Sequence, residues 1–207
     1  MSAHNRLRGV YASTRDGMDT AEMLRYSAAI LQGGASILQY RDKSNDSTKR
    51  KAEACALRDL CTRYQATFIV NDDVELACMV AADGVHLGAH DLSYAEARAK
   101  LGDRPIVGLS CYNQLGCAER AHLYGADYVA FGCFFRSSTK PLTTRAEPDL
   151  LQHKLPLPIC AIGGITLENA PQLIRYQPDM LAVSGALYRS SSPGHDARVL
   201  ASLFNLD

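Results

Sequence analysis

Short apolar runs rich in β-branched and aromatic residues recur along the chain and alternate with longer segments of helical spacing. The runs read GVYA, SILQY, TFIV, GVHL, IVGLS, YVAFG, ICAIG and MLAVSG, at residues 9–12, 36–40, 67–70, 84–87, 106–110, 128–132, 159–163 and 180–185. Runs that are apolar at nearly every position are typical of strands covered on both faces. The pattern therefore predicts eight buried β-strands.

Helix start and stop signals lie in the segments between the runs. Residues 93–96, Ser-Tyr-Ala-Glu, form a capping box, in which side chains at both ends satisfy backbone donors of the first turn. Asn113 and Gly125 bound a second helix, and Thr20 begins a third that ends at Gly33. The apolar face of this third helix consists of Leu24, Ala28 and Leu31. The chain is thus predicted to alternate strand and helix.

Repeated strand–helix units build parallel sheets, which are either open or closed into a barrel. No G-x-G-x-x-G sequence follows the first strand, and no ninth strand follows the eighth. Both observations favour a closed barrel over a dinucleotide-binding sheet. No linker or low-complexity tract interrupts the pattern. We therefore predict an α/β protein with one (β/α)₈ TIM-barrel domain over residues 1–207.

Composition narrows the class of protein. The 207 residues are 47% apolar, which is enough for one sizeable core. Lys plus Arg and Asp plus Glu both number 22, without runs of like charge, so neither nucleic acid nor an anionic membrane is an expected partner. No window approaches the roughly 18 apolar residues of a membrane span, and the N-terminus lacks an apolar signal core. A cytoplasmic protein is expected, and its oligomeric state stays open, with a homo-oligomer compatible with the sequence.

The chain contains an odd number of cysteines, seven, and no C-x-x-C pair. Disulfide frameworks and zinc sites usually need even or closely spaced cysteines. We therefore expect reduced, mostly buried thiols. They are Cys55, Cys61, Cys78, Cys111, Cys117, Cys133 and Cys160.

In a TIM barrel the functional residues gather where strands end, and polar side chains occur at these places here. Gln39, Arg41 and Lys43 alternate at the end of the second predicted strand, so in an extended chain they point to one side. Asn71 and Asp72 follow the third strand. An amide and two cations are therefore expected beside the third strand's polar end.

Asp91 follows the fourth predicted strand, and Asp72 follows its neighbour. Two carboxylates on adjacent strands suit a magnesium ion that takes its other oxygen ligands from water and a substrate phosphate. The alternative is a solvated pair of loop acids, and the nearby Arg41 and Lys43 favour the magnesium site. Asp83 precedes the fourth strand at the opposite end of the barrel, so it is expected to be a cap or turn residue.

Two histidines lie in this region. His86 is inside the fourth strand, where a hydrogen-bonded core histidine is favoured over a catalytic one. His90 lies in the following loop, and neither histidine has the spacing of a metal site.

Candidate phosphate ligands follow the sixth, seventh and eighth strands. Residues 137–140, Ser-Ser-Thr-Lys, combine hydroxyls with an ammonium. Gly163-Gly164 and Ser184-Gly185 end the last two strands, where this fold commonly holds phosphate on backbone amides. The alternative at both of these dipeptides is a tight turn without a ligand. Two phosphorylated ligands could meet between this cradle and the cationic site.

Seven motifs together resemble the thiamine phosphate synthase family in order and spacing. They are QYRDK, VNDD, ADGVHLGAHD, GLSCYN, DYVAFGCFFRSSTK, AIGGIT and AVSG, between residue 9 and about residue 188. The resemblance implies a (β/α)₈ transferase that joins hydroxymethylpyrimidine diphosphate to thiazole phosphate and releases pyrophosphate, with magnesium as cofactor. The product would be thiamine phosphate.

The resemblance also implies roles for individual residues. The pyrimidine diphosphate would be bound by Gln39, Tyr40, Arg41, Asp42, Lys43, Asn71, Ser110 and Lys140. The thiazole phosphate would be bound by Ser137, Ser138, Thr139, Gly164, Val183 and Ser184. Asp72 and Asp91 would be the metal ligands, and the catalytic set would be Arg41, Lys43, Ser110 and Lys140.

The chain departs from the family pattern at several places. Asp73 stands where Arg is common, Gly88-Ala89-His90-Asp91 replaces the usual G-Q-E-D, and Ser110-Cys111-Tyr112-Asn113 replaces S-x-H-N. Ser137 stands where Thr is frequent, which keeps the hydroxyl. No proposed ligand is lost, but the roles of His90 and Tyr112 stay open.

The implied mechanism is a dissociative displacement, in which the diphosphate leaves before the thiazole nitrogen attacks, so no general base is required. Two other functions share the barrel: a thiazole tautomerase, and a regulator that binds thiazole phosphate without turnover. The tautomerase needs no diphosphate chemistry. Retention of the cations and carboxylates at the strand ends favours the synthase.

Overall fold

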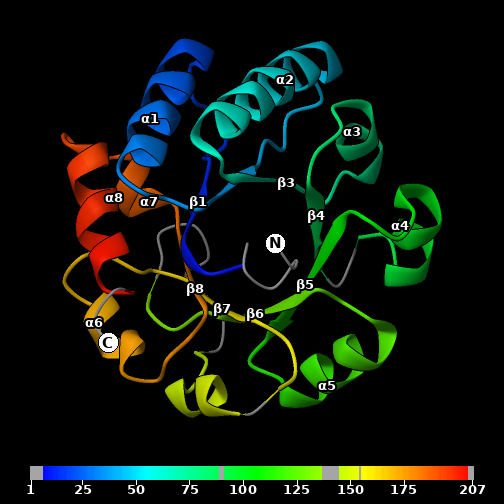
Figure 1. Ribbon diagram of the computed structural model, residues 1–207, viewed down its shortest axis with the longest axis vertical. Helices are drawn as coiled ribbons and strands as arrows, with labels where there is room; N and C mark the ends of the chain where they lie inside the picture. Colours follow the sequence, from blue (N-terminus) through cyan, green and yellow to red (C-terminus); the bar gives the residue numbers. More distant parts are fainter. Residues whose placement is uncertain (1–6, 89–90, 137–144, 154, 205–207) are drawn as a thin grey trace.

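The computed structural model describes residues 7–88, 91–136, 145–153 and 155–204. Eight parallel strands pair in sequence order and close into a barrel, with β1 beside β8, and helices surround it (Figure 1). The strands are β1 (Gly9–Ser13), β2 (Ile37–Tyr40), β3 (Thr67–Asn71), β4 (Gly84–Leu87), β5 (Ile106–Tyr112), β6 (Tyr128–Gly132), β7 (Ile159–Ile162) and β8 (Met180–Val183). The predicted (β/α)₈ fold and all eight predicted strands are confirmed.

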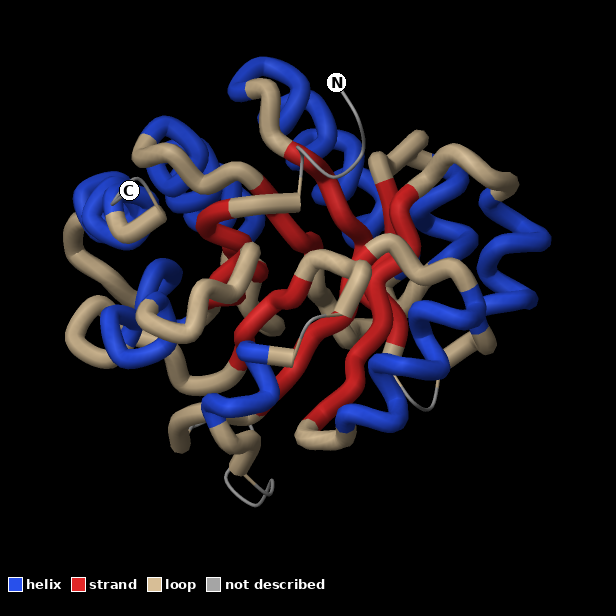
Figure 2. The backbone as a smooth tube through the Cα atoms, turned by 60° about the horizontal axis from the view of Figure 1, so that its bottom comes forward, coloured by secondary structure: helices blue, strands red, loops and turns tan. Residues whose placement is uncertain are grey.

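Helices follow the strands on the outside of the barrel (Figure 2). The α-helices are α1 (Thr20–Gln32), α2 (Ser47–Tyr64), α3 (Val74–Met79), α4 (Tyr94–Leu101), α5 (Leu115–Tyr124), α6 (Ala170–Ile174), α7 (Gly185–Tyr188) and α8 (Pro193–Ser202). Between β6 and β7 the described chain has only a short 3₁₀ helix, η2 (Pro148–Gln152). No helix in these described ranges is long and apolar enough to cross a membrane.

The predicted helix ends are confirmed at α1 and α4, and one end of α5 needs a small correction. The capping box at Ser93 is present, and Gly125 ends α5 in the left-handed conformation. Helix α1 begins at Thr20 and has Gly33 as its C-cap, as predicted, with Asp19 as the N-cap. Asn113 lies one residue outside its helix, because Gln114 is the N-cap of α5.

The buried face of α1 is rotated slightly from the predicted one. It consists of Met23, Ser27, Ile30 and Leu31, and the predicted Leu24 and Ala28 are half-buried at its edge. The cysteines also differ from the expectation of mostly buried thiols, because only Cys61, Cys111 and Cys160 are buried, while Cys55 and Cys78 are exposed. These two lie on the surface helices α2 and α3.

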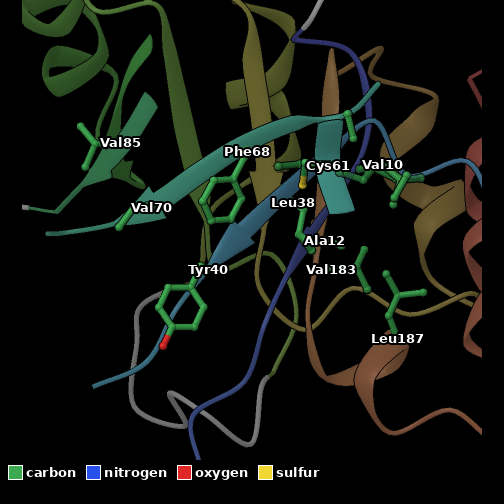
Figure 3. Packing of buried hydrophobic residues seen from close by; sticks show 14 of the residues in the cluster. Val10, Ala12, Leu38, Tyr40, Cys61, Phe68, Val70, Val85, Val183 and Leu187 are labelled. Atoms are coloured by element: carbon green, nitrogen blue, oxygen red, sulfur yellow. The ribbon is translucent and has the colours of Figure 1, made fainter. Parts of the chain in front are cut away.

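Alternation along each strand divides the core into two layers. The outer layer fills the space between barrel and helices, with Leu38, Phe68 and Val85 among its members (Figure 3). The inner layer fills the barrel and is made of Leu7, Tyr11, Ile37, Ile69, Ile106, Tyr128, Ala130, Cys160, Met180 and Ala182. Consecutive residues of one strand therefore enter different layers.

Three aspartates stand immediately before the even-numbered strands β4, β6 and β8. The carboxylates of Asp83, Asp127 and Asp179 accept hydrogen bonds from backbone N–H groups at the starts of the neighbouring odd-numbered strands. The donors are Phe68, Val107 and Ile159, each at 2.8 Å. The prediction that Asp83 is a cap residue is confirmed.

Candidate active site

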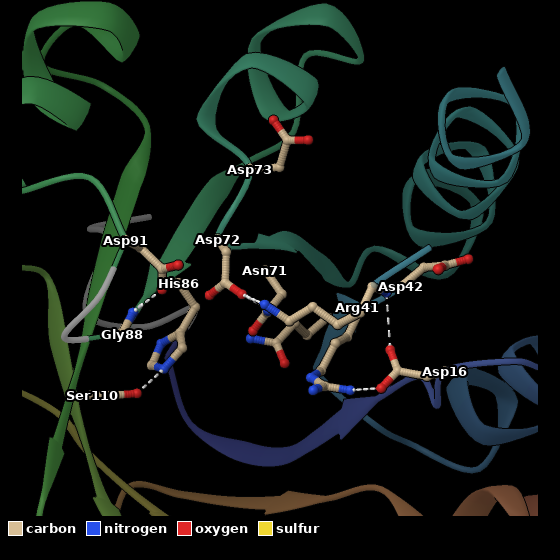
Figure 4. A network of polar contacts seen from close by, with 12 residues as sticks. Asp16, Arg41, Asp42, Asn71, Asp72, Asp73, His86, Gly88, Asp91 and Ser110 are labelled. Atoms are coloured by element: carbon tan, nitrogen blue, oxygen red, sulfur yellow. Dashed lines mark hydrogen bonds and ion pairs between the residues drawn. The ribbon is translucent and has the colours of Figure 1, made fainter. Parts of the chain in front are cut away.

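The carboxyl ends of β1 and β2 place Arg41 and Lys43 at the mouth of the barrel. Thr14, after β1, accepts from the backbone N–H of Arg41 at 2.7 Å. Asp16 forms an ion pair with the Arg41 guanidinium and accepts from the backbone N–H of Lys43 at 3.1 Å (Figure 4). The loop after β2 is therefore anchored on the loop after β1.

Asp72 connects this loop to the ends of β3 and β4. Its carboxylate forms an ion pair with Lys43 and accepts from the Asn71 amide at 2.6 Å. Its backbone takes the left-handed conformation, with φ of 63°, which Asp tolerates better than most residues. The Asp91 carboxylate accepts from the backbone N–H of Gly88 at 2.7 Å and lies beside Asp72 (Figure 4).

The electrostatics of Asp72 show the cost of this arrangement. Burial raises the pKa of Asp72, and the neighbouring Asp91 raises it further, while the Lys43 ammonium only partly opposes both. A cation between the two carboxylates would relieve this repulsion. No group of three or more His, Cys, Asp or Glu side chains converges in the described part of the chain. A metal held here would therefore need oxygen ligands from water or substrate.

A cavity of about 380 Å³ opens beside these residues. It is lined by Asp42, Lys43, Ser44, Asn45, Arg50, Asn71, Asp72, Asp73, Val74, Glu75 and Leu92. Asp73, at the position where the family pattern has Arg, is the N-cap of α3 and also pairs with Arg50 of α2 at 2.8 Å. Asp73 thus orders the wall of the cavity.

The opposite side of the mouth is formed by the ends of β6, β7 and β8. Gly163 and Gly164 have φ of 107° and 65°, and a Cβ on Gly164 would lie 2.5 Å from the carbonyl oxygen of Arg136. Only glycine allows this close approach of the segment after β6 to the end of β7. The Ser184 carbonyl starts the short helix α7, while its side chain forms no cap bond.

Comparison with known proteins decides the family. A family model described as thiamine monophosphate synthase matches residues 10–187. The chain belongs to the thiamine monophosphate synthase family. Two curated relatives named thiamine-phosphate synthase are each 49% identical: one from Methylobacillus flagellatus, over 96% of both chains, and one from Thioalkalivibrio sulfidiphilus, over 97% of both.

A solved structure supports the same family. Thiamine phosphate pyrophosphorylase from Pyrococcus furiosus superposes with a TM-score of 0.85 at 28% identity, covering 99% of this chain and 98% of that one. As a member of the thiamine monophosphate synthase family, the chain is a transferase of thiamine biosynthesis.

The described fold brings most of the residues implied by the family together. Gln39, Arg41, Lys43, Asn71, Asp72, Asp91 and Ser110 come from β2 to β5 and the loops after them, at one end of the barrel. Ser137, Ser138, Thr139 and Lys140 lie outside the described residues. The described residues that the resemblance implies therefore lie at one mouth of the barrel, and their individual roles stay predictions.

The side chains of three implied ligands, Tyr40, Val183 and Asp42, are held by other parts of the protein, and their roles as ligands stay predictions. Tyr40 is buried on the outer side of β2, and its hydroxyl donates to Glu53 of α2 at 2.7 Å. Val183 is buried in the outer core layer, so only its backbone could contact a phosphate. Asp42 accepts from the backbone of Ser44 at 2.6 Å.

Asp42 is moreover unsuited to binding an anion. Burial raises its pKa, but the hydrogen bonds from Ser44 and the charge of Lys49 outweigh this, so the pKa of Asp42 is lowered overall. The side chain stays a carboxylate that orders the loop after β2 and pairs with Lys49 at 3.5 Å. An anionic ligand would be repelled by it.

His86 and Ser110 lie deeper, at the top of the barrel interior. His86 is buried, with Nδ1 2.9 Å from the Tyr128 hydroxyl and Nε2 2.9 Å from Oγ of Ser110. The prediction of a hydrogen-bonded core histidine is confirmed. Ser110 lies four residues after Ile106 of the inner layer, so alternation along β5 turns its hydroxyl inward. A register shift follows between Ser110 and Tyr112 and makes Cys111 an extra residue in β5.

Three candidate residues on and after β1 were not predicted from the sequence. Thr14 and Asp16 hold the loop of Arg41 and Lys43, and Tyr11 lies in the barrel interior. The available signal was the polar Ser-Thr-Arg-Asp segment at 13–16, which follows the first strand as the other site residues follow theirs.

Proposed function

We propose that this chain condenses hydroxymethylpyrimidine diphosphate with thiazole phosphate to give thiamine phosphate and pyrophosphate. The observation that supports this best is the convergence of two cations, Arg41 and Lys43, and two carboxylates, Asp72 and Asp91, at one barrel mouth. A diphosphate leaving group needs cations, and a magnesium ion needs oxygen ligands.

Arg41 and Lys43 would bind the diphosphate. Arg41 and Lys43 are paired with Asp16 and Asp72, so a diphosphate would compete with these acids for both cations. Asp72 and Asp91 would hold magnesium, which neutralises charge on the departing diphosphate when it is bound. Lys140, from the resemblance, would add a third cation.

In the proposed reaction the methylene carbon–oxygen bond breaks, and its electron pair leaves with the diphosphate. The pyrimidine amino group stabilises the resulting cation, and the lone pair of the thiazole nitrogen then forms the new carbon–nitrogen bond. Because this nitrogen carries no proton, no general base is needed. Gln39 and Ser110, both at the top of the barrel interior, would orient the pyrimidine ring.

The thiazole phosphate would lie on the side of β7 and β8. Gly164, the backbone of Val183, and Ser184 would hold its phosphate, together with Ser137, Ser138 and Thr139 of the preceding loop. The Ser184 side chain is available for this role because it forms no cap bond to α7.

Pyrophosphate release tests the proposal against its alternatives. The purified protein is incubated with both substrates and magnesium, and pyrophosphate and thiamine phosphate are measured. We expect both products in equal amounts, and neither after chelation of divalent metal until magnesium is restored. A thiazole tautomerase would convert its thiazole substrate without pyrophosphate, and a regulator would bind thiazole phosphate without turnover. Either result would contradict the proposal.

A further inference from the structure

A continuous chain of hydrogen bonds crosses the interior of the barrel from Ser13 on β1 to Ser110 on β5. Its members in order are Ser13, Gln39, Tyr11, Tyr128, His86 and Ser110. The successive heavy-atom distances are 2.9, 3.1, 2.9, 2.9 and 2.9 Å. The chain joins Gln39 to Ser110, the two residues proposed to orient the pyrimidine.

The interior members of this chain are shielded from water. Tyr128 is 0% exposed, Tyr11 3%, Gln39 5% and His86 8%. The rings of His86 and Tyr128 are also stacked, with centroids 5.5 Å apart. A buried polar group that loses its hydrogen-bond partner costs free energy, so the bonds between these members are strongly favoured.

The proton inventory gives this chain a direction. The Gln39 amide oxygen accepts from Ser13 and its nitrogen donates to the Tyr11 hydroxyl. Each tyrosine has one proton to donate. Tyr11, having accepted from Gln39, donates to Tyr128, and Tyr128 then donates to Nδ1 of His86.

Burial raises the pKa of both Tyr11 and Tyr128 well above the ordinary value. Both phenols stay protonated throughout the usual pH range, so each remains a donor. The direction of the chain then follows from the orientation of the Gln39 amide, whose nitrogen faces Tyr11 and whose oxygen faces Ser13.

We propose that this chain holds His86 with its proton on Nε2, so that His86 donates to Ser110 and leaves the Ser110 hydroxyl proton for an acceptor at the mouth of the barrel. His86 and Tyr128 are then positioning residues. The fitting acceptor is a ring nitrogen of an aminopyrimidine, so the inference rests on the proposed function. Among the described residues, His86 is the only hydrogen-bond partner of Ser110.

The opposite polarity would make a different site. If His86 carried its proton on Nδ1, Nε2 would take the Ser110 proton, and Ser110 could only accept from a ligand. The chain thereby selects between ligands that present an acceptor and ligands that present a donor. The second N–H of the Gln39 amide has the same donor character at the other end of the chain.

Nitrogen NMR of the full-length protein, labelled with ¹⁵N histidine, tests the tautomer without any substrate. His86 is assigned by the signal missing from His86→Gln. We expect Nε2 protonated and Nδ1 unprotonated in the wild-type protein. A proton on Nδ1, alone or together with one on Nε2, would overturn the proposal even in a fully active enzyme.

Tyr128→Phe tests the link to catalysis, because it removes the donor to Nδ1 and keeps the ring. We expect a mixture of tautomers and a fall of about tenfold or more in kcat/KM for the pyrimidine diphosphate, the factor expected for one hydrogen bond. The KM for thiazole phosphate should hold. Tyr188→Phe is the matched control, since Tyr188 is also buried and hydrogen-bonded, to Ser27 at 2.8 Å.

A rescue series separates donation by Nε2 from simple packing. His86→Gln can place an amide N–H near the position of Nε2, whereas His86→Leu cannot. We expect His86→Gln to keep at least tenfold more activity than His86→Leu. Equal loss in the two, or an unchanged tautomer in Tyr128→Phe, would overturn the positioning role. Absence of pyrophosphate release by the wild-type enzyme would instead contradict the proposed function and leave the tautomer result standing.

Discussion

The charged residues at the barrel mouth neutralise one another before any ligand arrives. Arg41 is paired with Asp16, and Lys43 with Asp72. The Lys43 side chain is 53% exposed, so this pair contributes little to stability. The carboxylate of Asp72 is in a less favourable position, because burial and Asp91 both raise its pKa. This repulsion between Asp72 and Asp91 supports the proposal that a cation binds between them.

Asp72→Asn should abolish most of the activity while leaving the fold intact. Asn tolerates the left-handed backbone of this position and removes the charge that burial disfavours. In chelator, the thermal midpoint should hold or rise. Asp91→Asn should behave in the same way, and Asp103→Asn, at an exposed loop acid, is the control. Full activity of both site variants at limiting magnesium would refute the metal assignment.

Ser184→Leu should raise the KM for thiazole phosphate and leave binding of the pyrimidine diphosphate nearly unchanged, because the proposed cradle touches only one ligand. Ser184 is a better probe than Gly164, where any Cβ would collide with the backbone of Arg136. Steady-state kinetics with each substrate varied in turn measures both effects. Equal weakening of both substrates would mean that the cradle is misplaced.

At the scale of secondary-structure elements, the aspartates before β4, β6 and β8 all make the same kind of hydrogen bond. Each carboxylate accepts a hydrogen bond from a backbone N–H at the start of the preceding strand. Asp83 and Asp127 are also paired with Arg58 and Arg98 of the outer helices. These hydrogen bonds lie at the end of the barrel opposite the site, so we expect them to stabilise the folded protein and not to take part in catalysis.

Asp179→Ala should lower the free energy of unfolding by about 1–3 kcal/mol, because it leaves the Ile159 N–H without its partner. Activity at saturating substrate should not change, since Asp179 lies at the far end of the barrel from the proposed ligands. Asp103→Ala, on the surface at that same end, should stay within about 0.5 kcal/mol of the wild type. Urea unfolding monitored by circular dichroism compares the two variants. A loss of activity larger than the loss of folded protein would contradict the stabilising role.

At the scale of the whole molecule, the barrel closes where the first and last segments meet. β1 pairs with β8, and α1 packs on α8 (Figure 1). A Cβ on Gly33, at the end of α1, would lie 2.3 Å from the carbonyl oxygen of Gly194 in α8. The two helices can approach this closely only without a side chain there.

Gly33→Ala should therefore push α1 and α8 apart and destabilise the protein by about 1–3 kcal/mol. The control is Gly116→Ala in α5, where a Cβ would meet only the Arg120 guanidinium at 4.0 Å, an ordinary contact, so no loss is expected. Calorimetry should show one transition in both variants and in the wild type, since a single domain is predicted for residues 1–207. Two separate transitions in the wild type would contradict the single domain.

The cations at one mouth also lead to a prediction of how the rate of the chemical step depends on the substituents of the pyrimidine ring. If the carbon–oxygen bond breaks first, a trifluoromethyl group in place of the pyrimidine ring methyl should slow the chemical step by several orders of magnitude, since each factor of ten is about 1.4 kcal/mol. Substrate binding should change far less. Single-turnover rates within about tenfold of each other would refute the dissociative mechanism without touching the family assignment.

The sequence by itself determined the elements, the barrel and the location of the site. Apolar runs and helix caps such as Ser93 act between neighbouring residues, so they can be read without a fold. Parallel strands all end at one mouth, and this placed Arg41, Asp72 and Asp91 together before any coordinates were known. The predicted start of α5 was wrong by one residue, because the adjacent polar residues Asn113 and Gln114 compete for the cap.

Only the tertiary structure decided which way the side chains face and what they meet. Tyr40 follows Gln39 directly, yet one enters the outer core and the other the barrel interior, because strand residues alternate. Partners such as Tyr11 and Tyr128 are 117 positions apart in sequence and meet at 2.9 Å only after the barrel closes. The hydrogen-bond chain that ends at Ser110 exists only in this closed interior, because its members come from β1, β2, β4, β5 and β6, which no local sequence pattern brings together.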